Sequence, residues 1–303
     1  MKMKKNTFLL FSIVFFICLC ALGYFAINHI HLQLLEGEEG LMLSSTKEKI
    51  KTDNNLTFII FLDGYRNPKE GLVYTEVIKT VVQNLKPFNA YQDIFVFKTV
   101  TTEGQKCVVK KIYNRDSLMC NDKLFDSIKN LKIGHYKVIV LSPLDFISSS
   151  EYARGKNSSI FLSTYKGKLT NSKLQQWVGI LFAQELGHSL GLSYEYFGKK
   201  PSLYKTDDTY GSPNCAKSKD IAQRWWEEYR AQDPQIGYFM GCGNGDSYIY
   251  PEKNTLMSNF PKKDRYGLIS EQYLEGVLSC FYKNSQNTRC TDFREQYPFF
   301  WEE

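Results

Sequence analysis

Strand-like and helix-like segments alternate between residues 56 and 196. Residues 56–62 form a near-continuous apolar run of β-branched and aromatic side chains, the pattern of a strand buried on both faces. Further strand-like runs follow at residues 93–100, 136–141 and 158–164, with helical periodicity at 74–85 and 117–131 between them. This order predicts an α/β fold with a mostly parallel, twisted sheet and helices packed on it. The run at 158–164 is the most polar, so we expect it to be an edge strand.

The second part of the chain has little periodicity. Residues 197–253 are rich in Gly, Tyr, Asp and Pro, and the pattern predicts an irregular lobe with one short helix at 218–230. A closing helix is expected at residues 270–282. We therefore divide one domain, residues 55–303, into an upper subdomain (55–196) and a lower lobe (197–303).

The N-terminus predicts a membrane segment. Lys2, Lys4 and Lys5 precede an uncharged apolar run, residues 8–27, which as a helix is roughly 30 Å long, the thickness of a bilayer core. We expect a cytoplasmic tail (1–7), an uncleaved single-pass anchor (8–27), a polar stalk (28–54) and an extracytoplasmic domain. A cleaved signal peptide is the alternative, although the run is long and has no Ala-x-Ala site.

Six of the eight cysteines lie beyond this apolar run. An even number in an exported domain favours disulfides, and we expect sequential pairing: Cys107–Cys120, Cys215–Cys242 and Cys280–Cys290. A structural metal site is the rival, but no two of these cysteines have C-x-x-C spacing. The net charge of +6 is scattered without an arginine-rich block, so no nucleic-acid partner is expected.

Residues 174–196 predict a helix that ends at Gly191 and carries a polar cluster. A zinc peptidase helix has the pattern His-Glu-x-x-His, which places two imidazoles on one face beside a glutamate. Here Glu185 and His188 are present, but Gln184 occupies the position of the first histidine. A histidine beside a glutamate on a helix is more often an ordinary core or surface residue.

Two further features fit the longer zinc motif, in which a glycine and a third ligand follow the second histidine. Gly191 falls at the glycine position and Tyr194 at the third ligand position. Downstream, residues 254–259 resemble the Met-turn that lies below the metal in metzincins, with Met257 as its methionine. Both features in the right order favour metzincin descent.

On these residues the chain resembles the M64 family of metzincin peptidases. Residues 61–65 (Phe-Leu-Asp-Gly-Tyr) look like the first strand and turn of that family, and residues 184–189 look like its His-Glu-x-Gly-His-Ser helix. Residues 194–196 (Tyr-Glu-Tyr) look like its Asp-Glu-Tyr ending, and residues 248–251 look like the Tyr-Arg-Pro segment before its Met-turn. The resemblance spans residues 55–280. It implies a zinc cofactor and hydrolysis of a peptide bond by a metal-bound water, with Glu185 as general base.

Carried over by position, the resemblance leaves His188 as the one clear zinc ligand. Gln184 offers a neutral amide, which is a poor zinc ligand, and Glu195 is one residue past the third position. Tyr194 or Tyr196 would steady the oxyanion. We expect His135, the one other histidine of the domain, to have a structural role at the start of a strand, on the side opposite the site.

Two functions follow from the resemblance. The first is a membrane-anchored, outward-facing metallopeptidase acting on proteins or peptides. The alternative is an inactive pseudoenzyme of the same fold that binds an extracellular protein or peptide, with the aromatic residues of the lower lobe lining its cleft. These residues are Trp225, Trp226, Tyr229, Tyr238, Tyr248 and Tyr250. An unrelated α/β surface protein, in which the motif is coincidence, is the third possibility.

Overall fold

The computed structural model describes residues 55–102, 104–112, 114–129, 135–150, 158–195, 211–243, 245–258, 262–281 and 288–296. All of them belong to one compact unit, residues 51–303. The predicted tail, anchor and stalk (1–54) lie outside the described residues. Within the described part of the chain, no helix is both long and apolar enough to cross a membrane.

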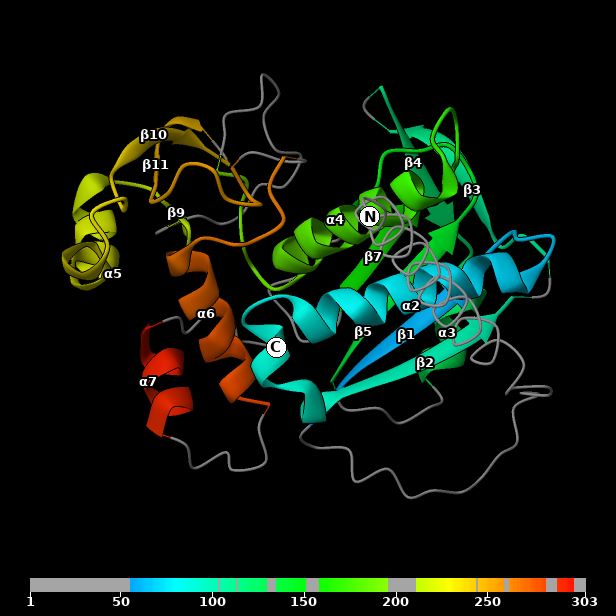
Figure 1. The fold of residues 1–303 in the computed structure, drawn as a ribbon, viewed down its shortest axis with the longest axis horizontal. Helices are drawn as coiled ribbons and strands as arrows, with labels where there is room; N and C mark the ends of the chain where they lie inside the picture. The colour runs from blue at the N-terminus through cyan, green and yellow to red at the C-terminus, as the bar shows by residue number, and fades with distance from the viewer. Residues whose placement is uncertain are drawn as a thin grey trace, which may run out of the picture. The chain divides into compact units, whose positions relative to one another are not determined.

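A five-stranded sheet forms the centre of this unit (Figure 1). Its strands are β1 (Leu56–Leu62), β2 (Phe95–Thr101), β5 (His135–Ser142), β6 (Ser149–Ser150) and β7 (Ser158–Ser163), in the order β2-β1-β5-β7-β6. The first four strands in that order are parallel, and β6 is antiparallel to β7. The α/β prediction with a mostly parallel sheet is therefore confirmed.

The expectation that residues 158–164 form an edge strand is wrong, because the short strand β6 pairs outside β7. Two residues of strand carry too little pattern to be found in a sequence. The added strand explains why β7 is largely buried despite its serines.

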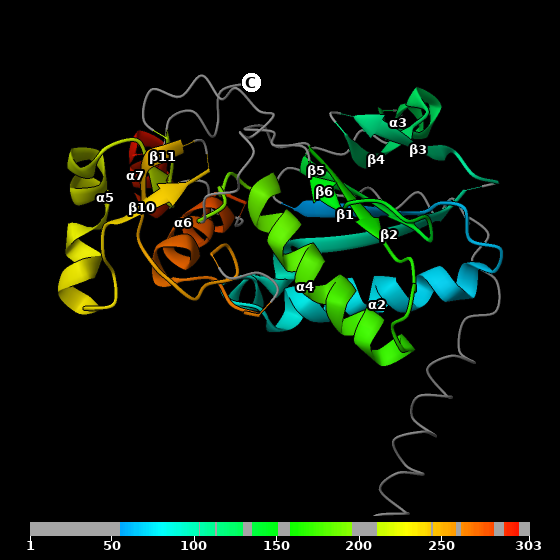
Figure 2. The same cartoon turned by 90° about the horizontal axis from the view of Figure 1, so that it is seen from above.

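Helices and a hairpin cover opposite faces of the sheet (Figure 2). On one face, α2 (Pro68–Asn84) and α4 (Asn171–Ser189) pack over alternate strand residues such as Phe58, Ile60 and Ile139. On the other face, β3 (Cys107–Ile112), β4 (Arg115–Cys120) and α3 (Asp122–Lys129) cover Ile59, Phe61 and Val138. Two 3-10 turns, Phe88–Ala90 and Gln92–Ile94, lead into β2. Burial on both faces explains the continuous apolar run of β1.

Part of the helix predicted at residues 117–131 is instead strand. Residues 115–120 form β4, which pairs with β3 in a register that places Cys107 opposite Cys120. The disulfide between these cysteines closes the hairpin, and the helix begins only at Asp122. Strand pairing within the hairpin thus overrides a local helical pattern.

Helix α2 begins at Pro68, earlier than the predicted residue 74. The Asn67 side chain accepts a hydrogen bond from the Lys69 N–H (3.0 Å), and proline in the first turn lacks the N–H that would be unpaired there. The pair Asn67-Pro68 therefore sets the start of α2. The first apolar residue of the helical pattern does not mark that start.

The lower lobe is more regular than predicted. A four-stranded antiparallel sheet has the order β10-β11-β9-β8, and α5 (Lys219–Gln232) packs on it. Its strands are β8 (Gly211–Ser212), β9 (Cys215–Ala216), β10 (Phe239–Cys242) and β11 (Gly245–Tyr250), followed by α6 (Leu268–Ser279) and α7 (Thr288–Gln296). The disulfides Cys215–Cys242 and Cys280–Cys290 are both formed, so all three pairs match the expected pairing.

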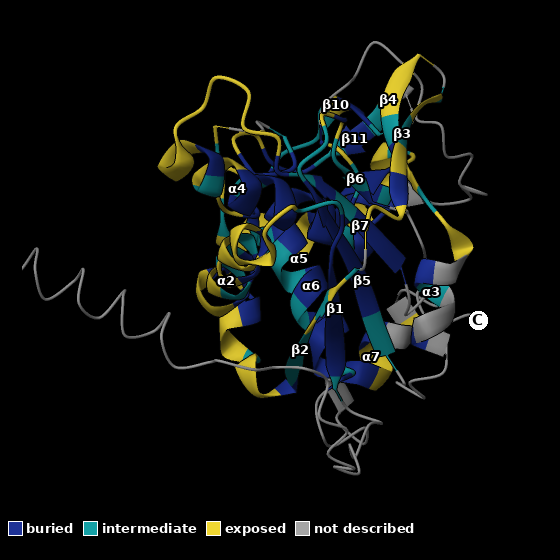
Figure 3. Ribbon diagram, turned by 90° about the vertical axis from the view of Figure 1, so that its right-hand side faces the viewer, coloured by how far each residue is buried: buried dark blue, intermediate teal, exposed yellow. Residues whose placement is uncertain are grey.

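The two predicted subdomains share one hydrophobic core. Met257, Tyr266 and Leu274 from the lower part belong to the same buried cluster as Phe58 and Phe182 from the upper part. In Figure 3 the buried residues run without a break through the sheet and the helices beside it. The polar end of α4 therefore lies at a junction between the two parts.

Candidate functional site

Helix α4 ends in a turn that gathers the polar residues. The N–H of Leu192 donates to the Gly187 carbonyl (2.9 Å), and the N–H of Gly191 donates to the His188 carbonyl (3.0 Å). These two bonds form a Schellman motif, which requires a left-handed residue, and Gly191 has φ 104°. The predicted helix end at Gly191 is therefore confirmed.

This turn also fixes the imidazole of His188. Its Nδ1 lies 2.8 Å from the Leu192 carbonyl, so Nδ1 carries the proton and Nε2 keeps a lone pair. Nε2 is buried and has no hydrogen-bond partner. Burial lowers the pKa of His188 to about 4, against the effect of the Leu192 carbonyl, so the ring is neutral at pH 7. The unprotonated Nε2 of His188 is therefore in the right state to act as a metal ligand.

Gln184 and Glu185 lie one turn earlier, and both are buried. Burial raises the pKa of Glu185 to about 8, although contacts with Ser150 oppose the change. Ser150 belongs to β6, so the carboxyl group lies beside the antiparallel edge strand of the sheet. The pKa of this buried glutamate therefore lies well above that of a glutamate in water.

Tyr194 covers the His188 ring. The two ring centroids are 4.0 Å apart, and Tyr194 is 37% exposed. The carbonyl of Tyr194 accepts from the Gly243 N–H (2.9 Å), which ties this segment to the lower lobe. At the third ligand position the structure thus has an aromatic ring that packs against the imidazole in a tilted arrangement, with 59° between the ring planes. Tyr196 lies outside the described residues.

Glu195 is held in a cage of hydrogen bonds. Its carboxyl accepts from Thr255 Oγ1 (2.5 Å), Asn214 Nδ2 (3.0 Å) and Ser270 Oγ (3.3 Å). The residue is fully buried, and burial raises its pKa to about 8 while these donors oppose the change. The three donors come from the β8–β9 turn, the Met257 turn and α6. Glu195 therefore ties three parts of the lower lobe together.

Met257 sits in a turn beneath α4. Thr255 and Ser258 close the turn through the Ser258 N–H and the Thr255 carbonyl (3.2 Å), and the Met257 carbonyl accepts from the Glu195 N–H (2.9 Å). Met257 is fully buried, and its Sδ would lie 3.2 Å from a Cβ placed on Gly187. A methionine in a turn under the polar helix is what the Met-turn resemblance led us to expect.

Sequence reasoning missed Lys137. This residue lies on β5 and is fully buried, and its Nζ donates to Ser158 Oγ (2.8 Å) and to the Ser189 carbonyl (2.7 Å). Burial lowers its pKa to about 7. The Ser189 carbonyl is one of those left unpaired at the end of α4. A lysine inside a strand run gives no sequence signal for such a role.

The donor set around His188 does not fit a tetrahedral zinc centre. Such a centre needs three protein ligands of imidazole, thiolate or carboxylate type. Glu195 is engaged with its three donors, Tyr194 packs against the His188 ring and Gln184 is a neutral amide. Among the described residues, no group of three or more His, Cys, Asp or Glu could hold a metal ion. His188 alone has the chemistry of a ligand.

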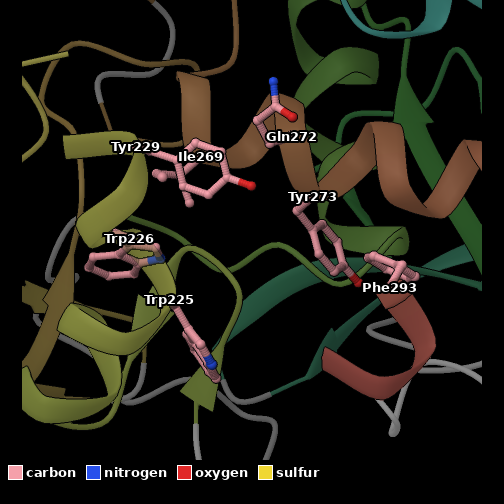
Figure 4. Close-up of a pocket in the computed structure, with 7 residues that line it drawn as sticks. All are labelled: Trp225, Trp226, Tyr229, Ile269, Gln272, Tyr273 and Phe293. Carbon is pink, nitrogen blue, oxygen red and sulfur yellow. The ribbon is translucent and has the colours of Figure 1, made fainter. Parts of the chain in front are cut away.

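Among the aromatic residues predicted to line a cleft, Trp226 is buried, and Trp225, Tyr229 and Tyr238 pack against the cluster that contains it. A cavity of about 30 Å³ is lined by residues of α5, α6 and α7 (Figure 4). That volume admits about one or two water molecules. Its lining residues are Trp225, Trp226, Tyr229, Ile269, Gln272, Tyr273 and Phe293. None of them belongs to α4, so the expected aromatic cleft beside the site is not formed by these residues.

His135 lies at the first position of β5, where its ring packs on Phe281 with centroids 5.0 Å apart. This ring takes part in a packing contact at the start of the strand. Lys137, two residues further along β5, contacts the end of α4 through the Ser189 carbonyl, so His135 does not lie on the side opposite the site.

No protein family model and no curated protein matches this chain. Among solved structures, an archaemetzincin from Methanopyrus kandleri matches with a TM-score of 0.32 and 14% identity. The match covers 48% of this chain and 78% of that chain. A likeness of that size supports no family assignment. What the fold and the site define is an α/β protein with a mostly parallel sheet and a buried polar helix end.

Proposed function

We propose that this chain is an M64-like metallopeptidase-fold protein with an incomplete metal site, which binds an extracellular protein or peptide without cleaving it. The proposal rests on Glu195. The acidic residue nearest to the third ligand position is fully buried in the hydrogen-bond cage of Asn214, Thr255 and Ser270. Releasing it toward His188 would leave three buried donors unpaired, which costs about 1–3 kcal/mol for each.

The sheet edge offers a place for the ligand. Strand β6 is antiparallel to β7 and has no further partner strand in the described part of the sheet. An extended peptide pairs with such an edge through main-chain hydrogen bonds. Because Ser150 of β6 contacts Glu185, a paired peptide would run past the polar end of α4. The anchor at residues 8–27 would present this edge outside the cell.

Zinc content tests the proposal. We would purify residues 51–303, the compact unit, as the unmodified protein and as Gln184→His and Gln184→His/Tyr194→Asp variants. We expect well below one equivalent of zinc in the unmodified protein and a rise only in the double variant. The double variant supplies a second imidazole and replaces the tyrosine ring that packs against His188.

Activity is measured on the same proteins with an unstructured protein substrate. Stoichiometric zinc and Glu185-dependent cleavage by the unmodified protein would overturn the proposal and restore the peptidase reading. The variant Glu185→Gln is the matched control, since it keeps the size of the side chain and removes its proton chemistry.

A further inference from the structure

Two exposed segments meet at the carboxyl edge of the parallel sheet. Residues 65–73 lead into α2 and residues 165–177 lead into α4. They are joined at the base by a hydrogen bond between the Tyr65 hydroxyl and Thr164 Oγ1 (2.5 Å). Figures 1 and 2 show the first turns of both helices emerging at the same end of the sheet, and Figure 3 looks onto that end.

The first turns of the two helices lie at nearby levels. Helix α4 touches α2 at Gly179, where a Cβ would meet Val77 and Val81 at 3.3 Å. Both helices follow parallel strands, so they run in the same direction. Trp177 precedes Gly179 by two residues, and Val73 precedes Val77 by four and Val81 by eight, so the two first turns are offset along the axis by about 3 to 9 Å. The exposed residues of these turns and of the loops before them lie at one end of the sheet.

The surface at this end combines exposed apolar residues with cations. Its apolar residues are 36–50% exposed: Leu72 (44%), Val73 (39%), Tyr165 (50%), Leu169 (38%) and Trp177 (36%). Large exposed apolar patches mark binding surfaces. Leu169 is presented by a turn in which its N–H donates to the Lys166 carbonyl (2.8 Å), with Gly167 at φ 48°.

The cations surround these residues. The two segments contain five basic residues, Arg66, Lys69, Lys166, Lys168 and Lys173, and one acidic residue, Glu70. All six are exposed. The chain as a whole has 38 basic and 32 acidic residues, a net charge of +6. The two short segments alone carry a net charge of +4, so the positive charge is concentrated there.

We propose that this surface, residues 65–73 and 165–177, docks on an anionic phospholipid membrane. Tyrosine and tryptophan flanked by lysines are the residues that favour the bilayer interface. Each lysine near an anionic surface adds attraction that salt screens. An anionic membrane is favoured over a protein partner because five cations and five exposed apolar side chains lie in the same two segments. The inference goes beyond the peptide-binding proposal and uses none of its residues.

Vesicle co-sedimentation of residues 51–303 tests the inference, because this unit contains the described core and the three disulfides but not residues 8–27. Vesicles of phosphatidylcholine alone are compared with vesicles containing phosphatidylglycerol. We expect binding to the anionic vesicles that weakens at least tenfold when salt is raised from 0.05 to about 0.5 M.

Two matched variants separate this surface from general charge. Lys166→Glu/Lys168→Glu changes the proposed surface, and Lys110→Glu/Lys111→Glu changes the charge equally on the β3–β4 hairpin. We expect at least a tenfold loss of binding in the first variant and less than a twofold loss in the second. Trp177→Ser should also weaken binding, and circular dichroism of each variant confirms that it is folded.

Three results would overturn the inference. They are the absence of binding to anionic vesicles, equal binding to neutral vesicles, and an equal loss in the two charge variants. Binding that survives Trp177→Ser and Leu169→Ser together would show that charge alone acts, which also contradicts insertion of the apolar residues.

Discussion

At the scale of single residues, the polar groups near α4 are buried and their partners decide their states. His188 is kept neutral with Nδ1 on a carbonyl, Glu195 is enclosed by three donors, and Lys137 contacts the last turn of α4 through the Ser189 carbonyl. Each is a titratable group whose burial shifts its pKa, so the stability of the domain should depend on pH.

Lys137 gives the clearest prediction. Its pKa is lowered to about 7 in the folded protein, against about 10.4 for a lysine in an unfolded chain. Between these values the unfolded chain binds more protons, so the free energy of unfolding rises with pH by up to about 1.4 kcal/mol per pH unit from this group. Lys137→Met should abolish that rise between pH 8 and 9.5.

Urea denaturation at several pH values measures this effect, and Lys110→Met serves as the control with the same change of charge at an exposed position. Glu185 and Glu195, with pKa values raised to about 8, act in the opposite direction. The stabilisation that these two carboxyl groups give to the folded state is fully present below about pH 4.5. It is lost as the pH rises through 8. An unchanged slope in Lys137→Met would contradict the buried position of this amine.

At the scale of elements, the end of α4 depends on one glycine. Gly191 has φ 104° and closes the Schellman turn that holds His188 through Leu192. Helix α2, by contrast, starts at a side-chain cap on Asn67. Local capping interactions therefore set the end of α4 and the start of α2. The left-handed conformation of Gly191 sets the direction of the chain after α4.

Gly191→Ala should destabilise the domain by about 1–2 kcal/mol, because an alanine resists a positive φ. Thermal denaturation measures the loss. Gln176→Ala on an exposed turn of the same helix is the control, and we expect a change within about 0.5 kcal/mol there. A neutral Gly191→Ala substitution would mean that the turn tolerates another conformation.

At the scale of the whole molecule, the upper and lower parts meet at Gly187. A Cβ at this position would lie 3.0 Å from Tyr266 Cε1 and 3.2 Å from Met257 Sδ, and the Tyr266 hydroxyl donates to the Ala183 carbonyl. Since Met257 and Tyr266 belong to the same cluster as Phe182, we expect the described unit to unfold in one cooperative transition.

Gly187→Ala should cost about 1–3 kcal/mol through overpacking. Met257→Ala makes room at the same contact, so the double variant should be less destabilised than the sum of the two single variants. Calorimetry of all four proteins tests both the coupling and the single transition. Additive losses, or a separate transition for the lower lobe, would show that the two parts do not meet at this contact.

Much of the fold could be predicted from the sequence because its signals are local. Residues 56–62 have the composition of a buried strand, Gly191 marks a helix end, and neighbouring cysteines pair in order. The errors fall where pairing between strands decides the outcome: residues 115–120 pair with β3 in a hairpin instead of forming a helix, and the two-residue strand β6 displaces β7 from the sheet edge.

For the candidate site, the sequence by itself determined which groups are present: one imidazole, Glu185, Gln184 in place of a histidine, and Met257 in a later turn. Only the tertiary structure decided what those groups do. Whether a carboxylate is a ligand or a structural hydrogen-bond acceptor depends on which donors reach it, and the donors to Glu195 come from residues 19, 60 and 75 positions away. Contacts of such separation leave no local pattern, because folding alone brings those residues together.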